Sequence, residues 1–418
     1  MGKTISEKIL SNHSGEDAYA GDIVIADIDF AMSQDGTTPL AIRSFRDMNS
    51  KNVWNPDRIA FVIDHSAPSP NQGVSNLHRM MREFAEEQNI RNLYDIGCGV
   101  CHQVMIEYGN VIPGDLVVGA DSHTCTYGAL GAFATGIGST DIAAVYSSGK
   151  LWFKVPETIK FIIDGNLEKG VYSKDLILHI IGKTAADGAT YMTTEFCGEV
   201  ISELSMDARF TICNMAVEMG AKTGIIKADK KTERWIKEGT DRKPRIIEND
   251  RDAKFYRELE FDAQDIEPKI AKPHRIDNVV DISEIEGLHI DEAYIGTCTN
   301  GRLEDLRIAA EILKGKQVNR NVRFIVAPAS KDVYLESMKK GIIQTLVRSG
   351  AAVVTPGCGP CVGTHNGVPS DGENVISTAN RNFKGRMGNN KAFIYLGSPA
   401  TVAASAVTGE ITDPREFL

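Results

Sequence analysis

Short apolar runs rich in β-branched residues alternate along the chain with longer amphipathic segments. The run at 58–64 (RIAFVID) is followed by 75–90, where apolar residues return at helical spacing at Leu77, Met80, Met81, Phe84 and Ala85. Later in the chain, a helix predicted over 302–315 is followed by strand candidates at 322–328, 351–355 and 392–396. This alternation predicts an α/β fold with mostly parallel sheets, helices on both sheet faces and ligands at the carboxyl ends of strands.

The length of 418 residues exceeds what one hydrophobic core serves, and a soft prior of roughly 150 residues per domain predicts two to four domains. Breaks at 154–157 (KVPE) and at Glu286–Gly287 predict three α/β domains, over 1–155, 156–286 and 287–418. The stretch 227–272 is dense in charge and poor in glycine, so we expect it to form a solvated, partly helical surface of the middle domain.

Hydrophobic residues make up 42% of the chain and charged residues 24%, which is typical of a globular protein. The net charge of −10 argues against a broad surface for nucleic acid or for an anionic membrane. Two long stretches without charged residues, 122–140 and 351–370, are rich in Gly, Thr, Ser or Pro, so neither reads as a membrane span. The first residues lack the apolar core of a secretory signal. We therefore expect a cytoplasmic protein with neither nucleic acid nor membrane as a partner.

Eight cysteines are too few for a disulfide scaffold, and two Cys-x-x-Cys pairs stand out. Cys98 and Cys101, followed by His102, match the attachment pattern of c-type haem, but that chemistry needs export. Cys358 and Cys361 form the CGPC of thioredoxin-like sites, yet glycines follow where that motif opens a helix. A dithiol redox protein stays a weaker alternative, and a zinc site lacks a second close ligand pair downstream.

Cys298 precedes Cys358 by 60 residues, and both lie in predicted loops between a strand and a helix. Three thiolates on adjacent loops, Cys298, Cys358 and Cys361, can hold a [4Fe–4S] cluster and leave one iron free to bind substrate. Isolated cysteines that bind no metal are usually small, buried core residues. Cys125, Cys197 and Cys213 are interpreted in that way, and Cys98 and Cys101 as lying near the site without binding metal.

Several motifs together resemble the aconitase superfamily, in particular the large subunits of the 3-isopropylmalate dehydratase and homoaconitase group. The resemblance spans nearly the whole chain. Its motifs are 33–39 (SQDGTTP), 63–65 (IDH), 100–103 (VCHQ), 119–124 (GADSHT), 211–218 (TICNMAVE), the two cysteine segments and 378–386 (TANRNFKGR).

This resemblance implies three α/β/α domains around a central cluster, without the swivelling C-terminal domain of single-chain aconitases. It implies one [4Fe–4S] cluster per subunit on Cys298, Cys358 and Cys361, with one iron not bound by protein. It also implies a hydro-lyase that removes water from, or adds it to, a small 2-hydroxy di- or tricarboxylic acid. The open iron would then act as a Lewis acid on the departing hydroxyl.

The resemblance also assigns roles to single residues. In the Asp64–His65 pair, the carboxylate would favour the imidazolium, which helps protonate the departing hydroxyl. The other catalytic candidates are His102, Asp121, His123 and Glu218. Substrate binding is expected from Gln34, Ser122, Arg381 and Arg386. The neighbours of the cluster are expected to be Asn214, Asn300 and Asn380.

The resemblance finally implies a partner, because the two-subunit relatives end where this chain ends. A separate small subunit would supply the swivelling domain and the base that abstracts a proton from substrate. The favoured substrate is 3-isopropylmalate, an intermediate of leucine biosynthesis. Homoaconitate, citramalate, 2,3-dimethylmalate and citrate stay open, because the group that distinguishes them lies largely on the small subunit.

Overall fold

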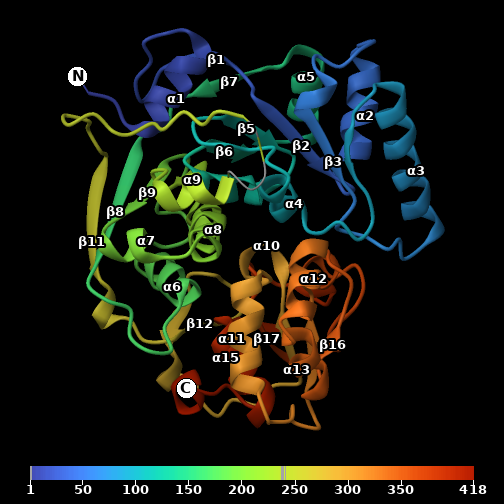
Figure 1. The fold of residues 1–418 in the computed structure, drawn as a ribbon, viewed down its shortest axis with the longest axis vertical. Coiled ribbons are helices and arrows are strands. Elements are labelled where there is room, and N and C mark those ends of the chain that lie inside the picture. The colour runs from blue at the N-terminus through green and yellow to red at the C-terminus, as the bar shows by residue number, and fades with distance from the viewer. Residues whose placement is uncertain (1, 237–239, 241) are drawn as a thin grey trace.

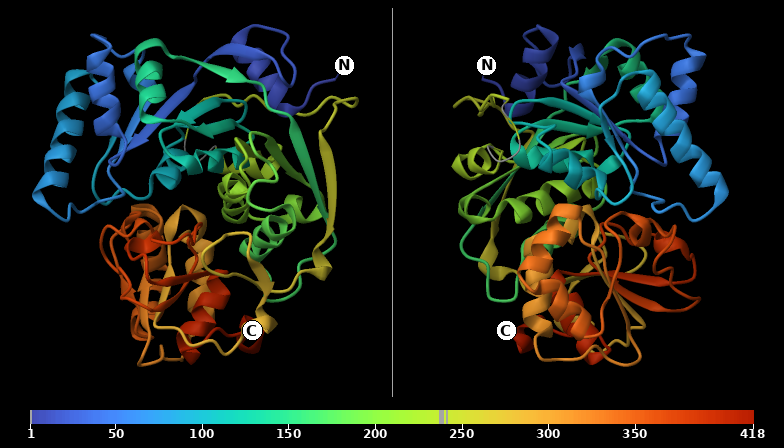
Figure 2. Two further views of the ribbon diagram at one scale, coloured as in Figure 1. Left: turned by 180° about the vertical axis from the view of Figure 1, so that it is seen from behind. Right: turned by 45° about the vertical axis from the view of Figure 1, so that its right-hand side comes forward.

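The computed structural model of the chain describes residues 2–236, 240 and 242–418. Three sheets of mostly parallel strands are covered by helices, which confirms the predicted α/β fold. The N-terminal third, the middle and the C-terminal third of the chain occupy separate regions of the molecule (Figures 1 and 2). The short helix α10 (Thr297–Asn300) lies where these regions meet, in contact with α4 and α8.

The first region contains a five-stranded parallel sheet in the order β4-β3-β2-β5-β6. The strands on either side of β2, namely β3 and β5, are apolar and buried along their whole length because helices cover both faces, as in other buried parallel sheets. The strands are β2 (Phe30–Gln34), β3 (Ile59–Val62), β4 (Asn92–Tyr94), β5 (Leu116–Gly119) and β6 (Phe133–Gly136). The helices are α1 (Ile5–Ser14), α2 (Thr38–Asp47), α3 (Gln72–Glu87), α4 (Cys101–Glu107) and α5 (Ser139–Ser148). A separate antiparallel pair joins β1 (Ile23–Asp27) to β7 (Lys150–Lys154).

The middle region is built on a four-stranded parallel sheet in the order β10-β9-β8-β11. Its strands are β8 (Thr158–Asp164), β9 (Thr193–Cys197), β10 (Thr223–Ile225) and β11 (Arg257–Asp262). Its helices are α6 (Ser173–Thr184), α7 (Glu199–Glu203), α8 (Met206–Asn214) and α9 (Lys230–Ile236). The charged stretch 227–272 thus supplies an edge strand, β11, besides the short helix α9, and charges on an edge strand oppose pairing with other chains. Residues 237–239 and 241 of that stretch lie outside the described residues.

The last region has a seven-stranded sheet in the order β13-β12-β18-β17-β14-β15-β16. Its strands are β12 (Lys269–Ala271), β13 (Val279–Asp281), β14 (Glu292–Ile295), β15 (Arg323–Val326), β16 (Ala352–Val353), β17 (Asn374–Ser377) and β18 (Phe393–Leu396). Its helices are α10, α11 (Leu303–Leu313), α12 (Lys331–Lys339), α13 (Ile342–Arg348), α14 (Gly359–Val362) and α15 (Pro399–Thr408). The antiparallel strands β12 and β13 precede residue 286, so this sheet crosses the predicted boundary, and the division into domains stays a prediction.

The predicted elements match the structure apart from their ends. The helix expected over 75–90 is α3, which begins three residues earlier because the Asn71 side chain accepts the Val74 N–H and caps it. The helix expected over 302–315 is α11. Short 3-10 segments complete the chain at Pro56–Arg58, Ser122–Leu130, Met215–Met219, Ala263–Asp265, Ile282–Glu284, Arg386–Gly388 and Pro414–Phe417. No helix among the described residues is long and apolar enough to cross a membrane.

Candidate active site

The predicted site residues follow the carboxyl ends of parallel strands in two different sheets. Asp64 follows β3 and Asp121 follows β5, while Cys298 follows β14 and Arg381 follows β17. Parallel strands end at one edge of their sheet, so each sheet collects its loops there. The two edges converge on one cavity with about 380 Å³ of space between atoms, part of it open to solvent. The residues that line it are His65, His102, Asp121, Ser122, His123, Thr297, Cys298, Cys358, Cys361, Val362, Asn380, Arg381 and Arg386.

Eleven of the predicted site residues line this cavity, and three more touch those that do. Asp64 binds His65, Asn214 binds Cys298, and Glu218 binds both His123 and Arg381. Two predicted residues lie elsewhere. The Gln34 side chain accepts the N–H of Gly36, and Asn300 points away from the cysteines and donates to Asp305 and Thr211. Asn300 turns away because it follows Cys298 by two residues in the short helix α10, which places it roughly 200° around the helix axis, on the opposite face.

The three cysteine side chains are buried, with exposed fractions of 4% for Cys298, 6% for Cys358 and 2% for Cys361. Burial raises the pKa of Cys298 to about 12 and that of Cys358 well above its usual value, because a thiolate loses its hydration there. A redox dithiol needs an accessible thiolate of low pKa, so these surroundings disfavour the dithiol alternative.

Nitrogen donors nevertheless point at the cysteine sulfurs. Asn214 Nδ2 lies 3.1 Å and Asn380 Nδ2 lies 3.5 Å from Cys298 Sγ, and Arg386 Nη2 lies 2.7 Å from Cys361 Sγ. The buried Arg386 Nε has no partner among the described residues. Three sulfurs in one cavity, with N–H groups directed at them, suit thiolates that a metal cluster holds deprotonated.

The segment that carries Cys298 is held by a buried cation. The Arg302 side chain is 0% exposed, and its Nη1 and Nη2 donate to the carbonyl groups of Thr299 and Cys298 at 2.8 and 2.5 Å. Its Nε donates to Gln103 Oε1 at 2.9 Å, which ties this segment to α4. Arg302 is not among the predicted site residues, because a sequence alone does not distinguish a buried arginine from an exposed one.

The hydrogen-bonded pair Asp64–His65, here called the acid pair, lies at the same cavity as the cysteines. His65 Nδ1 lies 2.8 Å from Asp64 Oδ1, and His65 Nε2 lies 3.4 Å from Asp121 Oδ2. Burial opposes a charge on His65, but the carboxylates of Asp64 and Asp121 outweigh burial and raise the pKa of His65 well above its usual value. The Cys358 N–H donates to the Asp64 carbonyl at 2.8 Å, so the acid pair and the cysteine loop are directly joined.

Asp35 holds this acid pair in place. Its Oδ1 accepts the backbone N–H groups of Asp64 and His65 at 2.9 and 2.7 Å, and Oδ2 accepts that of Ser66 at 2.8 Å. Asp35 is not among the predicted site residues, although it lies inside the motif 33–39. Its carboxylate directly after a strand was the available signal.

Further carboxylates and imidazoles connect the two sides of the cavity. His102 Nε2 lies 2.8 Å from Asp121 Oδ1, and His123 Nε2 lies 2.9 Å from Glu218 Oε1. Burial opposes the ionisation of the Asp121 and Glu218 carboxyl groups. The neighbouring histidines nevertheless lower the pKa of Asp121, and His123 and Arg381 lower the pKa of Glu218. The cavity therefore combines an imidazolium acid, ionised carboxylates and a guanidinium beside three thiols. Such a set can bind an acidic substrate and protonate a leaving group.

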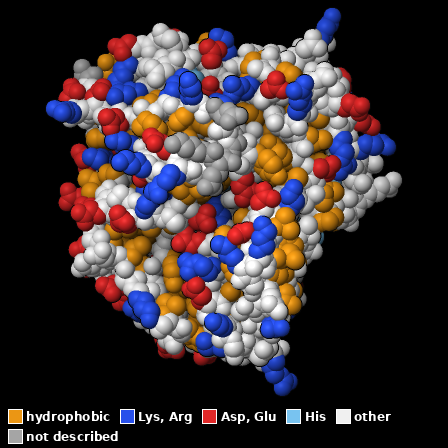
Figure 3. All heavy atoms as spheres, viewed as in Figure 1, with side chains coloured by type: hydrophobic (Ala, Val, Ile, Leu, Met, Phe, Trp, Pro, Cys, Tyr) orange, Lys and Arg blue, Asp and Glu red, His pale blue; other side chains and the backbone are white. Residues whose placement is uncertain are grey.

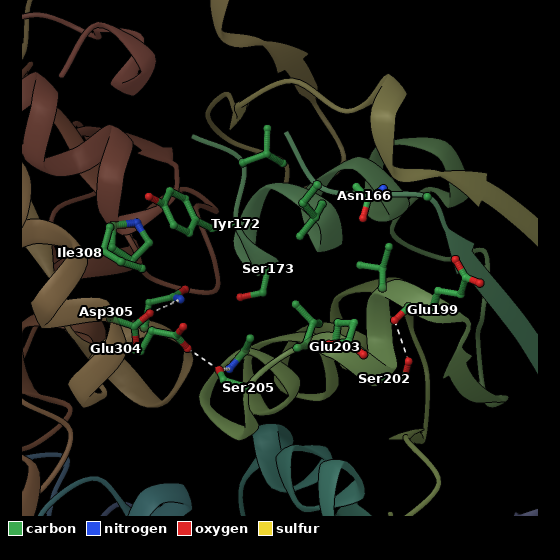
Figure 4. A pocket seen from close by; sticks show the side chains of 18 residues that line it. Asn166, Tyr172, Ser173, Glu199, Ser202, Glu203, Ser205, Glu304, Asp305 and Ile308 are labelled. Atoms are coloured by element: carbon green, nitrogen blue, oxygen red, sulfur yellow. Dashed lines mark hydrogen bonds between the residues drawn. The ribbon is translucent and has the colours of Figure 1, made fainter. Parts of the chain in front are cut away.

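A larger cavity, of about 1260 Å³ by the same measure, lies between α7, α8 and α11 (Figure 4). Glu199, Glu203, Glu304 and Asp305 give it an acidic lining, and the Ser205 hydroxyl donates to Glu304. None of the cysteines or histidines of the first cavity lines it. On the face of the molecule shown in Figure 3, basic and acidic side chains are interspersed.

The family model described as "Aconitase family (aconitate hydratase)" matches residues 7–286 and 283–409. The chain is 53% identical to a protein of Methanopyrus kandleri named "3-isopropylmalate dehydratase large subunit 1", over all of both chains. It is also 53% identical to the "Probable methanogen homoaconitase large subunit" of Methanosarcina mazei, over 94% of this chain and 100% of the other. Among solved structures, the aconitase X of Thermococcus kodakaraensis aligns with a TM-score of 0.48 at 14% identity, over 91% of this chain and 93% of that chain.

Proposed function

The chain belongs to the aconitase family, and on that premise we propose that it is the large, iron–sulfur subunit of a hydro-lyase for small 2-hydroxy dicarboxylic acids. The first candidate substrate is 3-isopropylmalate, and homoaconitate is the second, because relatives of equal identity carry these two names. The observation that carries the proposal is the single cavity in which three cysteines, the Asp64–His65 pair and Arg381 meet.

Cys298, Cys358 and Cys361 would hold a [4Fe–4S] cluster and leave one iron without a protein ligand. When bound, the cluster supplies a Lewis acid for the substrate hydroxyl. Asn214, Asn380 and Arg386 donate to the cysteine sulfurs, and such bonds stabilise negative charge on them. We therefore assign to Arg386 the role of a hydrogen-bond donor to Cys361. The sequence predicts instead that Arg386 binds substrate.

Water is eliminated when the hydroxyl leaves one carbon of the substrate and a proton leaves the next. His65, held as imidazolium by Asp64, protonates the departing hydroxyl from Nε2, so that water forms. Asp121 orients this edge of the imidazolium from 3.4 Å. The remaining proton goes to a base, and the electron pair of its C–H bond becomes the new C=C bond.

Arg381 binds a substrate carboxylate. Its Nε is occupied by Glu218, and a guanidinium has two further amino groups for a forked pair of hydrogen bonds. Ser122 lines the same cavity. A dicarboxylic acid is thereby fixed at one end, with its reacting carbons between His65 and the cysteines.

The partner is a small subunit, as the words "large subunit" in the names of the relatives imply. We assign to it the base that accepts the substrate proton and the contacts that select the substituent on the acid. The chain alone then binds the cluster but turns over slowly.

The test is anaerobic. The chain is reconstituted with iron and sulfide, with and without the small subunit of the same organism, and assayed with 3-isopropylmalate, homoaconitate, citramalate, 2,3-dimethylmalate and citrate. We expect the ultraviolet absorbance of a conjugated alkene to rise with one of the four hydroxy acids, or to fall with homoaconitate, which already carries the alkene and takes up water. Either change should need the small subunit. A complex with full iron content that is inactive on all five acids overturns the proposal.

A further inference from the structure

Lys174 is a buried cation in the first turn of α6, with an exposed fraction of 0%. Its Nζ donates to the carbonyl groups of Thr378 at 3.0 Å and Ala379 at 2.7 Å. Among the described residues its hydrogen-bond partners are these two carbonyl groups and no carboxylate, and burial lowers its pKa to about 7. A positive charge is also disfavoured at the N-terminus of a helix. An apolar side chain at this position would avoid these costs. The presence of a lysine is therefore explained by its hydrogen bonds to the two carbonyl groups.

The two carbonyl groups have no other hydrogen-bond donor within the described part of the chain. They come directly after β17, where the pairing with β14 and β18 ends. Both Thr378 and Ala379 are buried, and a buried carbonyl group without a donor is costly. Without Lys174 this loop would therefore have to move to find other donors or water.

The same loop delivers groups to the active site. Asn380 donates to Cys298 Sγ, and Arg381 follows it and binds Glu218. The Thr378 hydroxyl accepts the Gly296 N–H at 3.0 Å, beside the segment that carries Cys298. Lys174 thus joins α6, none of whose residues lines the cavity, to the backbone that places both a neighbour of the cluster and the carboxylate-binding arginine.

We propose that Lys174 is a positioning residue of the active site: its two bonds fix the loop 378–381 and thereby set where Arg381 meets the substrate carboxylate. The inference rests on the proposed function, in which Arg381 binds the substrate. It assigns no contact with substrate to Lys174 itself.

The kinetic test uses Lys174→Met, which keeps the length and apolar stem of the side chain but removes its donors. Because a misplacement of about 1 Å can cost about a hundredfold in rate, we expect kcat/KM of the holoenzyme complex to fall about 30- to 100-fold while iron content stays full. Lys183→Met, at an exposed lysine in the last turn of α6, is the matched control and should leave kcat/KM unchanged.

A double-variant cycle separates positioning from general loss of stability. If Lys174 acts through Arg381, Lys174→Met combined with Arg381→Lys should be no worse than the more damaging single variant. Fully additive losses, or a Lys174→Met enzyme with unchanged kcat/KM, overturn the proposal.

Crystal structures of the wild type and Lys174→Met without substrate give a readout that does not depend on the reaction. We expect the loop 378–381 to shift and the Arg381–Glu218 contact to break, and an unchanged loop overturns the proposal. A wild-type complex inactive on every acid would instead refute the proposed function and leave this structural result standing on its own. If the methionine variant does not fold, Lys174→Leu, which also carries no donor, is used with the same outcomes.

Discussion

Arg381 Nε donates to both carboxylate oxygens of Glu218, at distances of 2.8 and 3.1 Å. The terminal amino groups of this guanidinium form no hydrogen bond with any residue in the described part of the chain, and its side chain is 27% exposed. Glu218 is ionised because His123 and Arg381 outweigh its burial and lower its pKa. The pair therefore leaves one edge of the guanidinium free toward the cavity and fixes its orientation.

Arg381→Lys tests this orientation. A lysine keeps the charge but offers a single ammonium group, which cannot bind Glu218 sideways and a substrate carboxylate with a fork. A charge-assisted hydrogen bond contributes about 1.5–3 kcal/mol, so we expect kcat/KM to fall about 10- to 100-fold, mostly through a higher KM. Anaerobic steady-state kinetics measure this effect. Arg79→Lys, on the exposed face of α3, is the control, and an unchanged KM in Arg381→Lys would contradict the assignment.

Substitution of the cysteines tests the cluster ligands. Cys298→Ser, Cys358→Ser and Cys361→Ser should each lose most of the iron and the brown colour after anaerobic reconstitution, because a thiolate ligand is removed. Iron and sulfide per chain are the measurement. Cys197→Ser, at the end of β9 and away from the cavity, is the control and should keep the full cluster.

Cys101 is the sharper control, because its sulfur lies within 4.8 Å of ligand atoms of Asp64 and His65. We expect Cys101→Ser to keep its iron. Loss of iron there with retention in Cys298→Ser would move the cluster to a different set of cysteines.

Asp64→Asn tests whether His65, with its pKa raised by Asp64, is the acid that protonates the departing hydroxyl. The carboxylate of Asp64 raises the pKa of His65 against the effect of burial, so the imidazolium persists through neutral pH in the wild type and is lost only as pH rises above this raised pKa. Removing the negative charge lowers that pKa, and the alkaline limb of the profile of kcat against pH should move to lower pH. Asp57→Asn, on the surface, should leave the profile in place. An unmoved alkaline limb in Asp64→Asn would mean that His65 is not the acid.

Hydrophobic periodicity was enough to predict the α/β fold and the helices α3 and α11, because each of these elements buries one face and repeats its apolar positions. It also predicted that ligands gather at the carboxyl ends of the strands, where Cys298 and Arg381 lie. The candidate residues came from short motifs, and the family that these motifs resemble is confirmed by the comparison.

Long-range pairing and side-chain direction could not be predicted in that way. The strands β12 and β13 join the last sheet through β18, more than a hundred residues later, and no local pattern announces such pairing. Asn300 is two residues from Cys298, but the turn of α10 sends its side chain to Asp305. Lys174 and Arg302 are buried cations, although most lysines and arginines lie on the surface. A sequence does not show which of them are buried, so only the fold shows that these two hold the loops of the site.

Glu107, the last residue of α4, makes stability depend on pH. Its Oε1 accepts hydrogen bonds from Gln103 at 2.7 Å and Ser330 at 2.8 Å, and Oε2 has no partner among the described residues. Burial raises its pKa to about 7 from an ordinary value of 4.5. The folded state therefore holds this proton more tightly than the unfolded state does, so the contribution is fully present below pH 4.5 and is lost as pH rises through 7.

Glu107→Gln removes this titration. At pH 8 the difference between the two pKa values corresponds to a cost on the order of 3 kcal/mol for the wild type, which the neutral amide does not bear. We expect the free energy of unfolding in urea to fall less between pH 5 and pH 8 in Glu107→Gln than in the wild type, and the variant to be the more stable of the two at pH 8. Glu83→Gln, at an exposed glutamate of α3, should follow the wild type at both pH values. Equal slopes in Glu107→Gln and the wild type would show that Glu107 is charged in the folded protein and that its burial is compensated by another group.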